Sequence, residues 1–180
     1  DISLPAFEAA GDPTAYPDAG DPFEPQKLYY VVWSRARIQA THDKFVELGI
    51  ESPFGEDWFK RPSQDDQITT SIAIADWYDV RLDSLLAHAT QVDPSSPFWF
   101  GLPREVSRSV HPFDDYLLAR SRVDCDLPES DLFAAVRGEA VHEHGVLRGG
   151  SHQPVIDLVG REKIVPALGV LVAHRHPGIG

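Results

Sequence analysis

Four polar side chains recur at helical spacing within residues 79–91. Arg81, Ser84, His88 and Gln91 stand at positions i, i+3, i+7 and i+10. Because residues three and four apart share one face of an α-helix, this spacing predicts that His88 and Gln91 point the same way. An imidazole and a carboxamide placed in this way could reach a sugar hydroxyl or an amide from the wall of a cleft. The alternative is a solvated helix face with no binding role.

A lysine and two tyrosines lie close together in the run Lys27-Leu28-Tyr29-Tyr30. Residues 27–33 are rich in β-branched and aromatic side chains, which favour a strand. An ammonium group and phenolic hydroxyls at a strand end could bind a polar substrate. The alternative is an edge strand in which Lys27 extends its charged end into solvent and the tyrosines bury their rings.

Histidines late in the chain form two His-x-His pairs, His142 with His144 and His174 with His176. Zinc sites usually need three or four ligands held by a rigid scaffold with supporting groups around them. Two such pairs in glycine-rich sequence do not provide this, so we expect no metal site there.

Other reactive side chains and loop residues offer weaker signals. Cys125 lies between two aspartates, whose charges disfavour a catalytic thiolate. His42 and His111 show no partner in the sequence for a role as base or nucleophile. Tyr16 and Asp18 could contact a ligand, although a turn with Asp and Gly has a sufficient structural explanation.

Helices and strands are expected to alternate around these residues. Four prolines between Pro13 and Pro25 prohibit helix and regular strand up to residue 26. Ser34 can cap a helix that Gly49 ends. The expected elements are a helix end at 2–10, a strand at 27–33, a helix at 34–48, a loop at 51–66, a strand at 68–75, helices at 79–91 and 103–110, a strand at 116–123 and a helical turn at 130–136.

Composition excludes several classes of protein. A chain of 180 residues with 42% hydrophobic residues is typical of a globular protein. Its net charge of −12 disfavours nucleic acids and anionic membranes as partners, because their phosphates repel such a surface. The longest apolar run, 164–173, is shorter than the roughly 20 residues of a membrane span. One cysteine permits no internal disulfide and fits a cytoplasmic location.

The character of the chain changes near residue 138. All of the net negative charge lies in residues 1–137, whereas residues 138–180 are neutral and hold five of the eight histidines. We therefore expect 1–137 to form one unit and 138–180 to be an unrelated, poorly specified extension. The chain has no methionine and begins within an expected helix, so we expect it to be part of a longer protein.

Three blocks of the chain, 6–35, 79–93 and 119–136, resemble the LmbE-like family of zinc-dependent N-acetylglucosamine deacetylases. The second block contains RLDSLLAHATQ, which is similar to the family signature K-x-x-A-L-x-A-H-x-S-Q with Arg81 for the lysine and Thr90 for the serine. The runs AFEAAGDPTAYPDAG, LLAHATQVDP, LARSRV and LPESDLFA fit best the family branch that acts on mycothiol S-conjugates.

The resemblance implies an α/β fold with a Rossmann-like parallel sheet, to which this chain would contribute later strands and helices. It implies hydrolysis of an amide on a glucosamine nitrogen, with zinc polarising the carbonyl and activating water. The family's zinc ligands and catalytic groups lie in HPDDE and HPDH motifs, and neither motif occurs here. The resemblance thus places the zinc ligands upstream of Asp1 and implies no catalytic residue, and no zinc, for this chain alone.

The same resemblance makes Gln91 and His88 the first candidates for substrate contacts, followed by Lys27, Tyr29 and Tyr30. The implied partner is a small thiol–sugar conjugate. Two alternatives stay open: a deacetylase acting on an N-acetylglucosaminyl-inositol, and a binding module that kept the scaffold without the metal site. A sheet lacking its first strands would expose apolar faces and an edge, so we expect marginal stability and aggregation.

Overall fold

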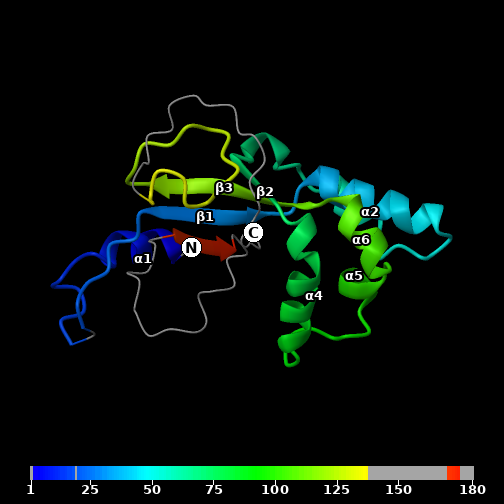
Figure 1. Ribbon diagram of the computed structural model, residues 1–180, viewed down its shortest axis with the longest axis horizontal. Coiled ribbons are helices and arrows are strands. Elements are labelled where there is room, and N and C mark those ends of the chain that lie inside the picture. Colours follow the sequence, from blue (N-terminus) through cyan, green and yellow to red (C-terminus); the bar gives the residue numbers. More distant parts are fainter. Residues whose placement is uncertain (1, 19, 138–169, 175–180) are drawn as a thin grey trace, which may run out of the picture.

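The computed structural model describes residues 2–18, 20–137 and 170–174 (Figure 1). In this part of the chain, helices and strands alternate around one mixed sheet. None of the helices in the described ranges is long and apolar enough to cross a membrane.

The sheet has four strands in the order β2-β3-β1-β4. Their bounds are β1 Lys27–Val32, β2 Thr70–Ala73, β3 Phe113–Ser121 and β4 Val170–His174. Strand β3 runs antiparallel to both β1 and β2, whereas β4 runs parallel to β1. The three strands expected from the sequence are confirmed with shifted bounds. The expected Rossmann-like parallel sheet is not what these strands form, because two of their three pairings are antiparallel.

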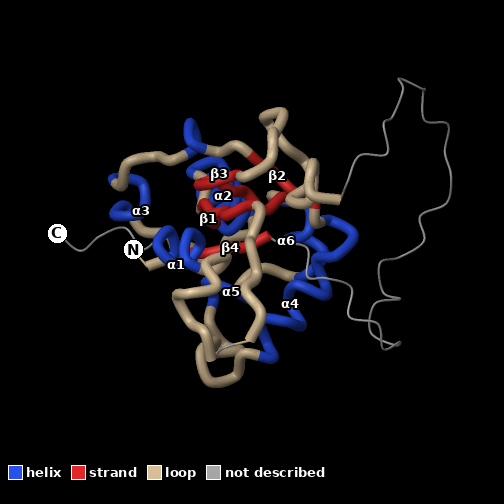
Figure 2. The backbone as a smooth tube through the Cα atoms, turned by 90° about the vertical axis from the view of Figure 1, so that its left-hand side faces the viewer, coloured by secondary structure: helices blue, strands red, loops and turns tan. Residues whose placement is uncertain are grey.

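Strand β1 lies inside the sheet, between β3 and β4 (Figure 2). Five of its six residues are buried, including all of the run Lys27 to Tyr30. The edge-strand alternative for this run is therefore wrong: both edges of β1 are paired, and the Lys27 side chain does not extend into solvent. Strand β4 comes from the expected C-terminal extension, so part of that segment joins the same sheet.

Helix α2, Arg35–Glu47, begins and ends where the sequence predicts. Ser34 caps it, since its Oγ accepts a hydrogen bond of 3.2 Å from the backbone N–H of Arg37. Gly49 follows the helix with a φ of +67°, a conformation that glycine adopts at little cost. The other helices are α1 Ser3–Ala9, α3 Glu56–Lys60, α4 Tyr78–Ala87, α5 Pro97–Phe100 and α6 Arg104–Val110, with 3₁₀ turns η1 Asp65–Gln67 and η2 Ala75–Trp77.

Helix α4 is shorter than the predicted helix 79–91. It ends at Ala87, and His88 and Gln91 lie in the turn that follows, where the carbonyl of His88 accepts hydrogen bonds from the N–H groups of Gln91 and Val92. Val92 is buried and brings the chain back to the core. The prediction that His88 and Gln91 share a helix face is therefore wrong, since neither is in the helix.

An apolar core joins α2 to the loops and short helices beyond the Val32 end of β1. Its buried members are Ile38, Phe45, Phe54 and Leu102, with Trp33, Trp58, Phe59, Phe98 and Val110 packed against them. The backbone passes close to this core at Gly101. A Cβ on residue 101 would lie 2.5 Å from the carbonyl oxygen of Pro97 and 2.7 Å from the Phe45 ring, so only glycine fits there.

Candidate functional site

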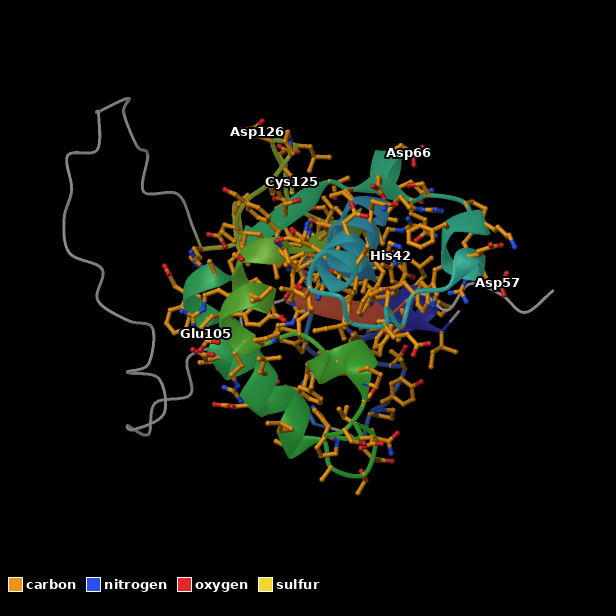
Figure 3. The ribbon with its side chains drawn as sticks, turned by 90° about the vertical axis from the view of Figure 1, so that its right-hand side faces the viewer. His42, Asp57, Asp66, Glu105, Cys125 and Asp126 are labelled. Atoms are coloured by element: carbon orange, nitrogen blue, oxygen red, sulfur yellow. The ribbon has the colours of Figure 1, made fainter. Side chains whose placement is uncertain are left out.

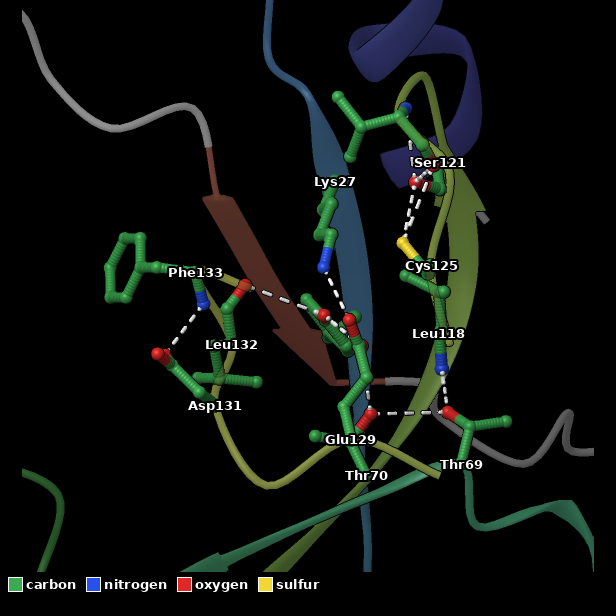
Figure 4. A network of polar contacts seen from close by, with 12 residues as sticks. Lys27, Thr69, Thr70, Leu118, Ser121, Cys125, Glu129, Asp131, Leu132 and Phe133 are labelled. Carbon is green, nitrogen blue, oxygen red and sulfur yellow. Dashed lines mark hydrogen bonds and ion pairs between the residues drawn. The ribbon is translucent and has the colours of Figure 1, made fainter. Parts of the chain in front are cut away.

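Three of the predicted substrate contacts lie on β1, and two of these meet a buried carboxylate. The Nζ of Lys27 lies 2.5 Å from Glu129 Oε1, and the hydroxyl of Tyr29 donates to Glu129 Oε2 over 2.5 Å (Figure 4). The hydroxyl of Thr70, on β2, lies 3.3 Å from the same oxygen. Lys27, Tyr29 and Thr70 are fully buried and Glu129 is 6% exposed, so this cluster is closed to bulk solvent.

Backbone pairing with β2 fixes Glu129 in this position. Residues Thr70 and Glu129 form an isolated parallel bridge, in which the N–H of Glu129 donates to the carbonyl of Thr69 and the N–H of Ser71 donates to the carbonyl of Glu129. The carboxylate therefore enters the sheet from the loop after β3. Burial, followed by the hydrogen bond to Glu129, raises the pKa of Tyr29, so its phenol stays a neutral donor.

His88 and Gln91 lie apart from this cluster, and Tyr30 follows Tyr29 on β1. Tyr30 is buried at 4% exposure, whereas His88 and Gln91 are exposed in the turn after α4. Helix α4 lies beyond the Val32 end of β1, while Lys27 opens the strand at the other end (Figure 1). The structure thus brings Lys27 and Tyr29 together but does not join them to His88 and Gln91. A role of these five residues in substrate binding stays a prediction.

A second polar cluster surrounds Asp115, at the start of β3. Ser34 Oγ and Ser71 Oγ each donate to its carboxylate over 2.8 Å, and His111 Nε2 lies 3.0 Å from Oδ2. The sequence analysis found no partner for His111, and the structure provides Asp115. Both hydroxyls bind the carboxylate rather than the imidazole, so the cluster lacks the serine–histidine hydrogen bond that activates a nucleophile. Its arrangement suits a structural role at the junction of β1, β2 and β3.

The pKa of Asp115 supplies a test of this cluster. Burial raises this pKa, but the hydrogen bonds from His111, Ser34 and Ser71 outweigh burial and lower it to about 2. A carboxyl group with a lower pKa in the folded than in the unfolded state stabilises the fold above about pH 4, and this contribution is lost as the pH falls toward 2. We expect the stability difference between the unchanged chain and Asp115→Asn to shrink across this range, measured by urea unfolding at pH 6, 4, 3 and 2. A difference that is constant with pH would contradict the assignment.

Cys125 and His42 do not form a thiol–imidazole pair. Figure 3 shows them well apart, with Cys125 on the loop after β3 and His42 on α2. Cys125 Sγ lies 3.3 Å from the carbonyl oxygen of Val123 and 3.2 Å from Ser121 Oγ, while His42 Nδ1 lies 2.9 Å from Ser52 Oγ. Neither arrangement provides an activated nucleophile.

The described side chains do not gather into a metal site. Within these residues, no group of three or more His, Cys, Asp or Glu side chains could hold a metal ion. The carboxylate of Glu129 already binds Lys27, Tyr29 and Thr70, and that of Asp115 binds Ser34, Ser71 and His111. The described residues therefore do not fit a zinc centre. His142, His144 and His176 lie outside the described residues.

Several curated proteins are similar to most of this chain. A mycothiol S-conjugate amidase from Streptomyces coelicolor is 41% identical over 146 residues, which cover 77% of this chain and 49% of the relative. A 1D-myo-inositol 2-acetamido-2-deoxy-alpha-D-glucopyranoside deacetylase from Frankia alni is 30% identical over 147 residues (76% and 50%), and one from Rhodococcus erythropolis is 32% identical over 147 residues (75% and 47%). The chain spans about half the length of these relatives. No family model and no solved structure matches it.

Proposed function

The chain belongs to the family that contains the mycothiol S-conjugate amidase and the related inositol acetylglucosaminide deacetylases, and from this we propose that it is part of a mycothiol S-conjugate amidase. In this function, the natural protein hydrolyses the glucosaminyl amide bond of mycothiol S-conjugates in the cytoplasm and serves detoxification. The observation that carries the proposal is the identity of 41% to the amidase, against 30% and 32% to the two deacetylases.

The zinc of such an enzyme would be held by family residues outside this chain. Two observations support this: the match spans about half of each relative, and the described side chains do not fit a metal centre. Under this proposal the present residues supply scaffold and substrate contacts. Gln91 and His88 are the exposed candidates for substrate contact, and Lys27, Tyr29 and Tyr30 are the buried candidates on β1.

Substrate preference of the natural protein that contains this chain tests the proposed function. We expect a higher kcat/KM for a fluorescent mycothiol S-conjugate than for the N-acetylglucosaminyl-inositol, by at least about tenfold, which is within reach of differences in pocket contacts. A preference for the inositol compound would move the chain to the deacetylase branch. Hydrolysis of neither compound, by protein shown to contain zinc, would refute both.

The 180-residue chain alone is expected to lack the zinc site of the natural protein. We expect it to bind less than stoichiometric zinc by elemental analysis and to hydrolyse no mycothiol S-conjugate. The matched variant replaces His142, His144, His174 and His176 by alanine. Zinc near one equivalent that this variant loses would show that the chain has a metal site of its own, contrary to the assignment.

A further inference from the structure

A cavity of about 60 Å³ lies where α2 meets α4, α5 and α6, separate from the Glu129 cluster. Aromatic side chains form part of its wall, beside the polar side chains of Arg37, Arg81 and His111. The rings of Trp33, Phe98 and Trp99 contact one another, with centroids 4.8–5.8 Å apart, and Phe45 and Phe54 also line it. A water molecule needs roughly 10–15 Å³ of such a cavity, so there is room for a small polar group and the first atoms attached to it.

Two arginines enter this cavity and share one carboxylate. Arg37 Nη1 donates to Asp114 Oδ1 over 3.2 Å, and Arg81 Nη1 lies 2.7 Å from the same oxygen. Arg81 Nη1 is buried, and its contact with Asp114 lacks hydrogen-bond geometry, so among the described residues this atom has no hydrogen-bond acceptor. Two guanidinium groups against one carboxylate leave a surplus positive charge.

No lining residue offsets this charge. Besides Arg37 and Arg81, the ionisable side chains that line the cavity are Tyr78 and His111, and His111 is engaged by Asp115. Burial and then the neighbouring Arg81 lower the pKa of Arg37, and Asp114 opposes this shift. A local positive surplus is notable in a chain whose net charge is −12.

Arg37 is also held in place by the aromatic wall. Its guanidinium carbon lies 4.6 Å from the centroid of the Trp33 ring, a stacking distance for a cation and an aromatic face. A guanidinium fixed in this way loses little conformational freedom when an anion binds, and its planar fork suits the two oxygens of a carboxylate. Aromatic rings beside it favour a flat or apolar group.

We propose that this cavity binds a small molecule in which a carboxylate is attached to an aromatic or apolar group. The carboxylate takes the hydrogen bonds that Arg81 Nη1 lacks and neutralises the surplus charge of the two arginines. The attached group packs against Trp33, Phe98 and Trp99. The proposal concerns binding alone and does not depend on amide hydrolysis by the natural protein.

Titration of the full chain with sodium benzoate at constant ionic strength tests the proposal, with benzamide as the neutral compound of the same shape. Tryptophan fluorescence reports binding, since Trp33 and Trp99 line the cavity, and calorimetry gives the affinity. We expect benzoate to bind and benzamide to bind more weakly by about tenfold or more, because an ionised acceptor forms stronger hydrogen bonds with a guanidinium than a neutral one. Equal binding of both, or no benzoate binding, would overturn the proposal.

Variants then locate the site. We expect Arg81→Gln to weaken benzoate binding by about tenfold or more, for the same charged hydrogen bond. Arg104→Gln removes an arginine that pairs with Asp79 and Asp83 at the surface, and it should bind benzoate like the unchanged chain. If Arg81→Gln shows no cooperative melting, Arg81→Lys decides: it keeps the charge but loses the fork, and unchanged benzoate affinity would refute the assignment.

Discussion

Replacing Glu129 by leucine is expected to lower the free energy of unfolding by about 3–5 kcal/mol, the usual loss when one partner of a buried ion pair is removed. The ammonium group of Lys27, which is fully buried, would lose the carboxylate that lies 2.5 Å away. The hydroxyls of Tyr29 and Thr70 would lose the acceptor that they share. Urea unfolding followed by circular dichroism measures the change.

Two further variants separate the buried pair from a general effect of charge. Arg137→Gln breaks a pair with Asp131 that is about half exposed, close to Glu129 in the sequence, and should cost less than about 1 kcal/mol. The double variant Lys27→Met with Glu129→Leu should recover much of the loss, because no uncompensated charge is left in the sheet. A loss for Glu129→Leu no larger than for Arg137→Gln would mean that the pair is not buried as described.

Replacing Phe45 by alanine is expected to lower the free energy of unfolding by about 3–5 kcal/mol, the range for truncating a buried phenylalanine. Phe45 is 1% exposed on α2, belongs to the apolar core and lies against Gly101. Its loss leaves a void that the surrounding backbone cannot close without moving. The midpoint of urea unfolding, at unchanged slope, reports the difference.

The neighbouring position on the same helix provides the control for Phe45. Val46 is 61% exposed, so Val46→Ala should change the free energy of unfolding by no more than about 0.5 kcal/mol. Both variants shorten an apolar side chain of α2 by truncation at the same carbon. Similar losses for the two would contradict the placement of Phe45 in the core, because alanine has a higher helix propensity than either residue and cannot itself destabilise α2.

Local signals predicted much of the fold. The Ser34 cap, the glycine after α2 and the prolines before β1 act within a few residues, and the structure confirms the elements that they bound. The end of α4 was missed because burial of Val92, a tertiary contact, removes His88 and Gln91 from the helix. The antiparallel direction of β3 relative to β1 and β2 was also not predicted. The residues of a strand do not identify the strand with which it pairs.

The polar clusters around Glu129, Asp115 and the two arginines could not be predicted from residues that are close together in the sequence. Glu129 lies 102 residues after Lys27 and 59 after Thr70, so nothing near the lysine indicated a buried partner. Arg81 was predicted to lie on the polar side of its helix, and in the structure it lines a cavity. The other two charged residues there, Arg37 and Asp114, come from α2 and β3, so the sequence around Arg81 did not indicate them. His111 and Asp115 are four residues apart, yet they belong to a helix end and a strand, where helical spacing carries no information.

The hydroxyl of Ser34 takes part in two hydrogen bonds at once. It accepts from the backbone of Arg37 in the first turn of α2 and donates to Asp115 on β3. Opening of that turn therefore removes a hydrogen-bond donor from the Asp115 carboxylate. Conversely, loss of the Asp115 carboxylate loosens the helical turn that carries Arg37. Amide hydrogens at the start of α2 and in β3 should consequently exchange with solvent as one cooperative unit, which links the arginine cavity to the sheet energetically.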